Sequence, residues 1–430
     1  MHMSRVIKKQ WTVMVYMAGD NNLDGAGVID LMEMKKIGST SGLNIIVQFD
    51  LQGKNKSTNR YYIQKRGSLA GDIVARLGET NMGDPKVLEN FVAWGAKNYP
   101  SMHYLLVLWN HGAGWDDANL YEGDVFGGAL PPVSRKRQPM PARKTTRRGA
   151  KALPFTIARA ALSRTRRALF STSVATAMSA RAIAFDDQAQ DFLDNLELKK
   201  VMRRVRKILK KPVDILGMDA CLMSMIEVAY QMRDLAAFTV GSEETEPGDG
   251  WPYDRILKTL ASRPYMTPDG LSKEIVKQYL ASYSASDNVT QSALRLADLK
   301  NMIRDIDALG GALKAALSDE AKKAAIMTVR AGAQEYSRPY DDYCDLLDLC
   351  GRLEKVVKDS AVRDACSHVA KAAGAAIIAS GYKGTAVDGS RGISIYFPKR
   401  RISPLYNRLD FTRASSWDEF LKSYIISIGR

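Results

Sequence analysis

Short apolar runs and amphipathic stretches alternate along the first 260 residues. Almost wholly apolar residues fill the runs 11–18, 43–50, 104–109, 213–218 and 238–242. Apolar residues recur at helical spacing in the stretches 26–37, 84–98 and 194–211. Near-continuous apolar runs of this length are typical of parallel strands that are buried on both faces. The alternation of strands and helices therefore predicts an α/β fold with a doubly wound, mostly parallel sheet.

The last third of the chain is richer in helical patterns. We expect helices at 269–284, 298–316, 318–331 and 361–375, and one further strand at 392–398 that ends at a proline. This pattern predicts a helix-rich region that lies against the sheet and returns one strand to it. The predicted organisation is a first part of the sheet domain, an insert, a second part of the sheet domain and the helix-rich region, at 1–130, 131–182, 183–260 and 261–430.

Two reactive side chains stand just past two of the apolar runs. His111 follows the run at 104–109, whereas Cys221 follows the run at 213–218 and precedes a helical pattern that extends to about Arg233. Reactive groups collect at the carboxyl ends of the strands in open α/β sheets, so the fold should bring thiol and imidazole together. A helix that begins at Cys221 would favour the thiolate, and the imidazole can shuttle its proton. The pair is typical of a cysteine peptidase.

Two neighbouring residues extend this candidate site. Gly112 carries no side chain, so its backbone N–H could face a scissile carbonyl and form an oxyanion hole with the amide of Cys221. Asp219 lies two residues before Cys221 and therefore on the same face of the strand. Its carboxylate could cap the following helix or pair with a guanidinium or ammonium group of a substrate, and we favour the second interpretation.

The residues themselves predict no metal site. Residues 20–25 fit the first half of a calcium-binding loop, but Leu31 stands where such a loop requires a bidentate Glu. The four cysteines show no metal-ligand spacing and stand at 221, 344, 350 and 366. We therefore expect no structural zinc and no disulfide framework.

The net charge of +15 is concentrated in one segment. Thirteen Lys or Arg residues and no acidic residue lie within 131–182, which leaves +2 for the rest of the chain. No apolar run reaches the roughly 18 residues that span a bilayer, so we expect no transmembrane segment. The first ten residues are polar and basic, so we expect no signal peptide in the chain as given. The sequence does not assign a cellular location.

The basic insert allows three interpretations. As a nucleic-acid element it could contact phosphates, but only Phe155 and Phe170 are available for stacking on bases. As a membrane-surface helix, the stretch 155–169 has a modest amphipathic pattern. As an activation linker, its Pro, Arg, Lys, Thr and Ala residues suit a flexible segment whose basic side chains fit an acidic pocket. We favour the linker, and the stretch 155–169 remains without an assigned role.

Several motifs, taken in order, resemble the clostripain-type family of cysteine peptidases, which belongs to the caspase-like group. They are Val-Met-Val-Tyr-Met-Ala-Gly-Asp-Asn-Asn-Leu at 13–23, Trp-Asn-His-Gly-Ala-Gly-Trp at 109–115, the stretch from Asp214 to Ser224, Glu-Pro-Gly-Asp-Gly-Trp-Pro-Tyr at 246–253, and the late strand at 392–398. The resemblance covers essentially the whole chain except the insert. It implies a caspase-like α/β/α sandwich with a mostly parallel central sheet.

The resemblance also implies roles for individual residues. His111 and Cys221 would form the catalytic dyad, Asp219 would select Arg or Lys in the substrate, and Asp249 would form a second wall of that pocket. Activation would occur by self-cleavage in a linker between the two dyad segments. Calcium stimulates some members of the family, so calcium is allowed here although the sequence requires no cofactor.

These observations predict a cysteine endopeptidase that is made as a single-chain zymogen and cleaves after Arg or Lys. Its partners would be protein or peptide substrates with Arg or Lys at the cleavage site. We expect no nucleic-acid partner, and we expect a monomer that consists of two fragments after processing. The alternative is a nucleic-acid or anionic-membrane binding protein on an inactive peptidase fold.

Overall fold

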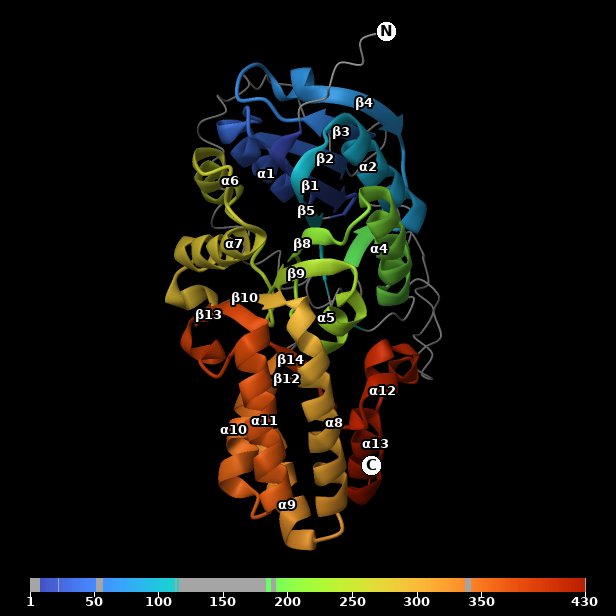
Figure 1. Cartoon of the computed structure of the whole chain (residues 1–430), viewed down its shortest axis with the longest axis vertical. Coiled ribbons are helices and arrows are strands. Elements are labelled where there is room, and N and C mark those ends of the chain that lie inside the picture. The colour runs from blue at the N-terminus through green and yellow to red at the C-terminus, as the bar shows by residue number, and fades with distance from the viewer. Residues whose placement is uncertain are drawn as a thin grey trace, which may run out of the picture.

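A nine-stranded sheet forms the centre of the protein (Figure 1). The computed structural model describes residues 8–21, 23–51, 57–112, 114–115, 183–186, 191–336 and 342–429, so the insert at 131–182 lies outside the described residues. The strand order is β13-β10-β9-β8-β5-β1-β2-β3-β4. The bounds are β1 Lys9–Gly19, β2 Leu43–Leu51, β3 Thr58–Tyr62, β4 Ile73–Gly78, β5 Ser101–Trp109, β8 Val213–Asp219, β9 Ala236–Gly241, β10 Val289–Arg295 and β13 Ile377–Lys383.

The middle of this sheet is parallel and its two margins are antiparallel. β1 pairs in parallel with both β2 and β5, and β8 does so with both β5 and β9. β3 and β4 on one side, and β10 and β13 on the other, join through antiparallel pairs. The five apolar runs of the sequence correspond to the five parallel strands, because these strands are buried on both faces.

Helices cover both faces of the sheet and complete an α/β/α sandwich (Figure 1). One face carries α1 Asp24–Ile37, α6 Tyr253–Ser262 and α7 Pro268–Ser282. The other carries α2 Pro85–Asn98, α4 Asn195–Leu209 and α5 Ile226–Met232. Two hydrophobic clusters correspond to these faces: Val13, Val15 and Met17 of β1 belong to the first, and Met14 and Tyr16 to the second. This alternation follows from side chains that point to opposite faces along a strand.

The predicted fold class is confirmed, and most of the helices expected from the sequence start and end within about two residues of their predicted positions. Capping explains several of the helix starts. The Asp84 side chain accepts a hydrogen bond from the Lys86 amide at 2.8 Å, and the Asp194 side chain accepts one from the Glu197 amide at 2.6 Å. An oxygen at the N-cap satisfies amides that lack a partner within the helix.

The C-terminal region is mainly helical and lies beyond one edge of the sheet (Figure 1). Its helices are α8 Leu299–Ala316, α9 Glu320–Gly332, α10 Leu346–Val356, α11 Ser360–Ala376, α12 Asp410–Ala414 and α13 Trp417–Ser427. A three-stranded sheet consists of β11 Glu335–Tyr336, β12 Tyr343–Asp345 and β14 Ser394–Tyr396. A hairpin of β6 Ile183–Asp186 and β7 Asp191–Leu193 precedes α4. No helix in the described part of the chain is both long and apolar enough to cross a bilayer.

The expectation that the strand at 392–398 returns to the central sheet is wrong. β14 pairs with β12 in the small sheet, and a single bridge from Ser394 to Met225 connects it to the segment after β8. Instead β10 and β13, which the hydrophobic pattern does not reveal, extend the central sheet. β10 is buried yet contains Thr290, Gln291 and Ser292, so its polar side chains conceal the strand.

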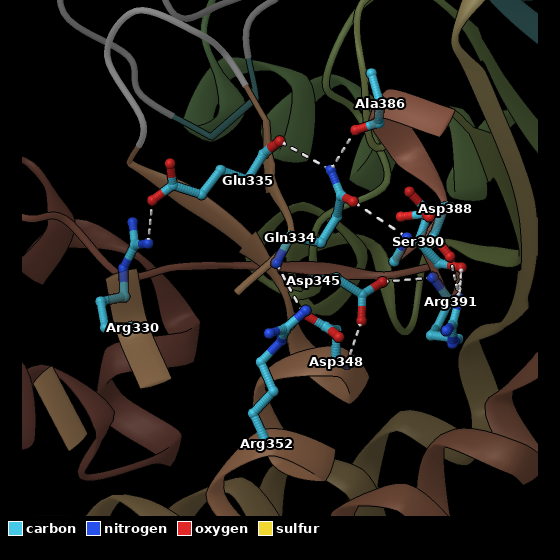
Figure 2. A network of polar contacts seen from close by, with 11 residues as sticks. Arg330, Gln334, Glu335, Asp345, Asp348, Arg352, Ala386, Asp388, Ser390 and Arg391 are labelled. Atoms are coloured by element: carbon cyan, nitrogen blue, oxygen red, sulfur yellow. Dashed lines mark hydrogen bonds and ion pairs between the residues drawn. The ribbon is translucent and has the colours of Figure 1, made fainter. Parts of the chain in front are cut away.

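A network of polar contacts surrounds the small sheet (Figure 2), and one further hydrogen bond connects it to the segment after β9. The Gln334 side chain donates a hydrogen bond to the Ala386 carbonyl at 3.0 Å, and the Asp345 carboxylate accepts one from the Arg391 amide at 2.5 Å. The next amide, that of Gly392, donates to the Glu243 carboxylate at 2.9 Å. Glu243 lies two residues after β9, so the network reaches a loop that borders the ends of the parallel strands.

Candidate active site

The two residues expected to form a dyad lie at the ends of adjacent parallel strands. β5 pairs with β8 in a register that places Trp109 opposite Asp219. His111 lies two residues after Trp109, and Cys221 lies two residues after Asp219. The two residues therefore leave the sheet side by side. Both line one cavity together with the loop after β9. The sequence-based expectation that the fold brings them to a common cavity therefore agrees with the geometry.

Cys221 lies in a turn and not at the start of a helix. α5 begins only at Ile226, and Leu222 has a φ of 63°, so the chain turns sharply after the cysteine. The expectation that a helix begins at Cys221 is wrong, because this left-handed residue interrupts the helical pattern. The thiol consequently has no helix N-terminus beside it. Its sulfur accepts a hydrogen bond from the Glu246 amide at 3.3 Å.

Burial keeps both groups uncharged in this structure. Only 5% of Cys221 and 6% of His111 are exposed. Burial raises the pKa of the Cys221 thiol to about 12, although hydrogen bonds from the Glu246 and Gly112 amides oppose the shift. Burial also lowers the pKa of His111 to about 4. The pair is therefore a neutral thiol beside a neutral imidazole, because each charged form would have to be desolvated.

The segment that carries His111 is fixed by the side chain of Asn110. The Asn110 carboxamide donates a hydrogen bond to the Ala18 carbonyl at the end of β1, and its oxygen accepts the backbone N–H of His111. The Asn21 side chain donates to the same oxygen at 3.2 Å. These contacts attach the loop after β5 to the neighbouring strand and so fix the backbone at the imidazole.

Gly112 packs directly against the turn that carries the thiol. A Cβ atom at this position would lie 2.6 Å from the Cys221 carbonyl oxygen and 2.8 Å from the Ala220 Cβ. Glycine is therefore needed at this position because the two segments approach each other closely. In the same loop, the residue with a positive φ is Gly114, at 86°. The backbone N–H of Gly112 is hydrogen-bonded to the Cys221 sulfur.

Asp219 lies on the floor of the cavity, as the alternation along β8 predicts. It is 4% exposed, and its Oδ2 accepts hydrogen bonds from the Tyr253 hydroxyl at 2.8 Å and the Trp251 amide at 3.3 Å. Burial raises the pKa of Asp219 to about 6. The carboxylate is thus mainly ionised at neutral pH and is the cavity's candidate partner for a cation.

Two further buried carboxyl groups surround Asp219, and the sequence analysis did not assign them to the site. Glu246 lines the cavity and is hydrogen-bonded to Asp219 through its side chain, while Asp30 of α1 accepts a hydrogen bond from the Trp109 indole at 2.7 Å. Burial, together with the charge of Asp219, raises the pKa of both well above the usual range. For Asp30, the signal in the sequence is its position beside apolar Leu31 and Met34 on the buried face of a helix.

Asp249, the expected second wall of the pocket, is exposed and does not line the cavity, whereas Glu246, Pro247, Gly248 and Gly250 of its loop do. Its charge adds to the rise in the pKa of Asp30. The cavity itself has a volume of about 30 Å³. That volume holds about one or two water molecules, so the side chain of an arginine does not fit in this state of the protein.

Three carboxylates elsewhere lie close enough together to share a cation. Oxygen atoms of Asp20, Asp50 and Glu79 lie within 4.8 Å of one another, at the carboxyl ends of β1 and β2 and just beyond β4. Calcium prefers carboxylate and carbonyl oxygens, so these residues fit the ion that the family resemblance allows. They are separate from the residues that line the Cys221 cavity.

The fold and the paired strand ends define a cysteine peptidase of the caspase-like class. The sequence model of the clostripain family matches residues 15–125 and 171–424, so the chain belongs to that family of cysteine proteases and the resemblance seen in the motifs is confirmed. Clostripain of Hathewaya histolytica is 25% identical over 90% of this chain and 74% of its own length.

Solved structures show the same fold. A secreted C11 cysteine protease from Bacteroides thetaiotaomicron, in complex with an irreversible peptide inhibitor, aligns with a TM-score of 0.60 and 20% identity over 95% of this chain and 100% of its own. An inactive zymogen C11 protease from Parabacteroides distasonis aligns with a TM-score of 0.62 and 18% identity over 95% and 98%. At this identity the agreement supports the fold.

Proposed function

We propose that the protein is a cysteine endopeptidase in which Cys221 is the nucleophile, His111 the proton shuttle and Asp219 the selector of Arg or Lys. The observation that carries the proposal is the single cavity at the ends of β5 and β8, which contains thiol, imidazole and a buried carboxylate. Each of these groups has one task in the cleavage of a peptide bond next to a basic residue.

The chemistry follows from the two neutral groups. The Cys221 sulfur forms a bond to the scissile carbonyl carbon while its proton passes to His111, and the Gly112 and Cys221 amides stabilise the oxyanion. When the intermediate collapses, the C–N bond breaks and the imidazolium gives its proton to the leaving amine. Water then attacks the thioester with His111 as the base, which releases the acid product and restores the thiol.

The acidic floor accounts for the preference for a basic side chain. A guanidinium or ammonium group at Asp219 would form a charge-assisted hydrogen bond in a site shielded from water. It would also favour the ionised forms of Glu246 and Asp30, because a cation lowers the pKa of neighbouring carboxyl groups. A neutral substrate side chain provides no such compensation for burying these carboxyl groups.

The small volume of the cavity supports a zymogen. The Glu246 amide contacts the sulfur, both reacting groups are buried, and the cavity is too small for an arginine side chain. We infer that self-cleavage within 131–182 lets the walls of the cavity separate. The insert joins the segments that carry His111 and Cys221, so it is tethered near an acidic pocket at high effective concentration.

A time course of the purified full-length protein tests this proposal. Mass spectrometry should find new termini after Arg or Lys within 131–182 as activity on an Arg-amide reporter appears. Cys221→Ala protein should stay intact and inactive. The two fragments should co-elute on gel filtration, because β5 and β8 are paired within one sheet. Full activity of a protein that stays uncut would show that cleavage is not the switch.

Two further elements of the proposal concern partners and calcium. The substrates are protein or peptide chains, and the processed enzyme is a monomer of two fragments. If calcium acts on this chain, Asp20, Asp50 and Glu79 are the residues that would hold it. A bound cation there would stabilise the ends of β1 and β2.

A further inference from the structure

A second and much larger cavity lies at the other end of β8. Its volume is about 540 Å³, within the usual range for small-ligand sites. It is formed by α4 and by the segment from the end of α5 to the start of β9. Its walls consist of Lys199, Arg203, Arg206, Lys207, Lys210, Gln231, Arg233, Asp234 and Leu235; we call it the α4 cavity.

Six of the nine lining residues are cationic. Lys199 and Arg233 are paired with Asp410, the latter with Nη1 at 3.0 Å from the carboxylate. Arg203, Lys207 and Lys210 make no ion pair with a residue that the structure describes. These three therefore present uncompensated positive charge to the cavity.

The cations follow one side of α4. Arg203, Arg206, Lys207 and Lys210 stand at the spacing of helical neighbours, and Lys210 ends the helix with a φ of 58°. At a rise of about 1.5 Å per residue they extend over roughly 10 Å. The negative end of the helix dipole accounts for basic residues in the last turn, but not for Arg233 and Lys199, which complete the other walls.

A buried amide lies in the wall of the cavity. Gln231 is 1% exposed, and its Oε1 accepts a hydrogen bond from the Asp410 amide at 2.9 Å. Its Nε2 is buried and has no hydrogen-bond partner among the described residues. A buried donor without an acceptor is costly, so an acceptor in the cavity toward which this side chain could turn would stabilise the site.

We propose that the α4 cavity binds a small anion made of linked phosphate groups. Guanidinium and ammonium groups are the side chains that bind phosphate oxygens, and a 10 Å row of cations suits several linked phosphates better than one. Among the described residues of the lining, Leu235 is the only apolar one and none is aromatic, so the site recognises the phosphate chain and not a base. The concave shape with a buried amide favours a narrow anion over a flat polymer surface.

This site is separate from the peptidase cavity. Lys210 and Leu235 lie at the amino ends of β8 and β9, whereas Cys221 lies past the carboxyl end of β8. A strand of this length extends about 20 Å, so the ligand cannot occupy the substrate site. The proposal does not depend on the peptidase assignment.

Calorimetric titration of full-length Cys221→Ala protein with tripolyphosphate, at about 150 mM salt, tests the proposal. We expect one strong site, which Gln231→Glu weakens at least tenfold: the variant keeps the acceptor for the Asp410 amide but replaces the donor with a carboxylate. The double variant Lys207→Gln, Lys210→Gln should weaken binding equally, and because both residues are exposed it should fold normally. Lys200→Gln is the matched control, since Lys200 is exposed on α4 but does not line the cavity.

The ligand comparison defines the chemistry. A nucleoside triphosphate should bind within about threefold of tripolyphosphate, and orthophosphate at least tenfold more weakly. Absent binding, or binding that Lys200→Gln weakens as much as the cavity variants do, would overturn the proposal. Binding that survives both cavity variants would belong to the cations of the basic insert, and that result would overturn it as well.

Discussion

The two cavities at opposite ends of β8 differ in charge, size and exposure. The Cys221 cavity contains carboxyl groups, a thiol and an imidazole, all buried around about 30 Å³. The α4 cavity has about 540 Å³ and mostly exposed cations. Burial changes the protonation of the first set of groups, whereas solvent leaves the second set charged. Both cavities are partly open to solvent, but in the described structure only the second has room for more than a few water molecules.

The two cavities also differ in how strongly their charged groups interact with one another. In the Cys221 cavity, the charge of Asp219 contributes to the raised pKa of Asp30 and Glu246, so these buried carboxyl groups depend strongly on one another. In the α4 cavity the like charges are spread along a helix and solvated, so their repulsion is small. Substitutions should therefore have large effects in the Cys221 cavity and graded effects in the α4 cavity.

The largest expected effect is the loss of the nucleophile. Cys221→Ala should lower kcat/KM for an Arg-amide reporter at least about a thousandfold, because no other group can form the thioester. Cys366→Ala is the matched control, since this cysteine is also buried but lies in α11. Steady-state kinetics on each protein decides the point. Comparable activity in both variants would show that Cys221 is not the nucleophile.

Gly112→Ala should have the next largest effect. The added methyl group would lie 2.6 Å from the Cys221 carbonyl oxygen, so the turn and the oxyanion amides must shift apart. Misplacement of this kind lowers kcat about 10- to 1000-fold. Gly311→Ala in α8 has nothing within 4 Å of the new atom, so it should keep full kcat and unfold at a slightly higher temperature. Wild-type kcat in Gly112→Ala would show that this approach is not needed for catalysis.

Asp219→Asn should reduce selectivity for basic substrates. The change keeps the shape of the side chain but removes its charge, which costs about 2 to 5 kcal/mol of kcat/KM for an Arg-amide reporter. Asp249→Asn, at an exposed position, should cost less than about 1 kcal/mol. Turnover of Arg-amide and neutral-residue reporters by processed enzymes measures both. A larger loss of kcat/KM in Asp249→Asn would show that the selecting carboxylate lies in the loop after β9.

The sequence predicts the parallel core because its strands are apolar on both faces, and it predicts His111, Cys221 and Asp219 from their places at strand ends. It misses β10, whose buried polar side chains are satisfied by partners distant in sequence. Ser292, for example, donates to the Gly392 carbonyl at 2.6 Å. It misplaces the start of α5, because the left-handed turn at Leu222 depends on tertiary contacts. Asp30 lies near Asp219 because its carboxyl group accepts a hydrogen bond from Trp109. Trp109 is distant in sequence, so no local pattern reveals this contact.

The smallest expected effect is on stability, and it has opposite signs in the two cavities. Because burial raises the pKa of Asp219 to about 6, the folded state holds this proton more tightly than the unfolded chain does. Its contribution to stability is therefore fully present below about pH 4 and is lost as pH rises through about 6. Asp410 borders the α4 cavity. Burial alone would raise its pKa, but hydrogen bonds from Lys199 and Arg233 lower it, so its contribution is present at neutral pH and is lost as pH falls.

Urea unfolding of Cys221→Ala protein at pH 4.5 and pH 7.5 measures this contrast. Added to that background, Asp219→Asn should flatten the pH dependence and gain stability at pH 7.5 relative to pH 4.5, by an amount on the order of 2 kcal/mol. Asp410→Asn should cost nearly the same stability at pH 4.5 and pH 7.5, because both values lie above the ordinary pKa of an aspartate, and its cost should shrink only below about pH 4. The difference between the two pH values cancels any pH-independent packing cost of each substitution. If Asp410→Asn changes the pH dependence between these values as much as Asp219→Asn does, the two carboxyl groups do not differ in the way their surroundings imply.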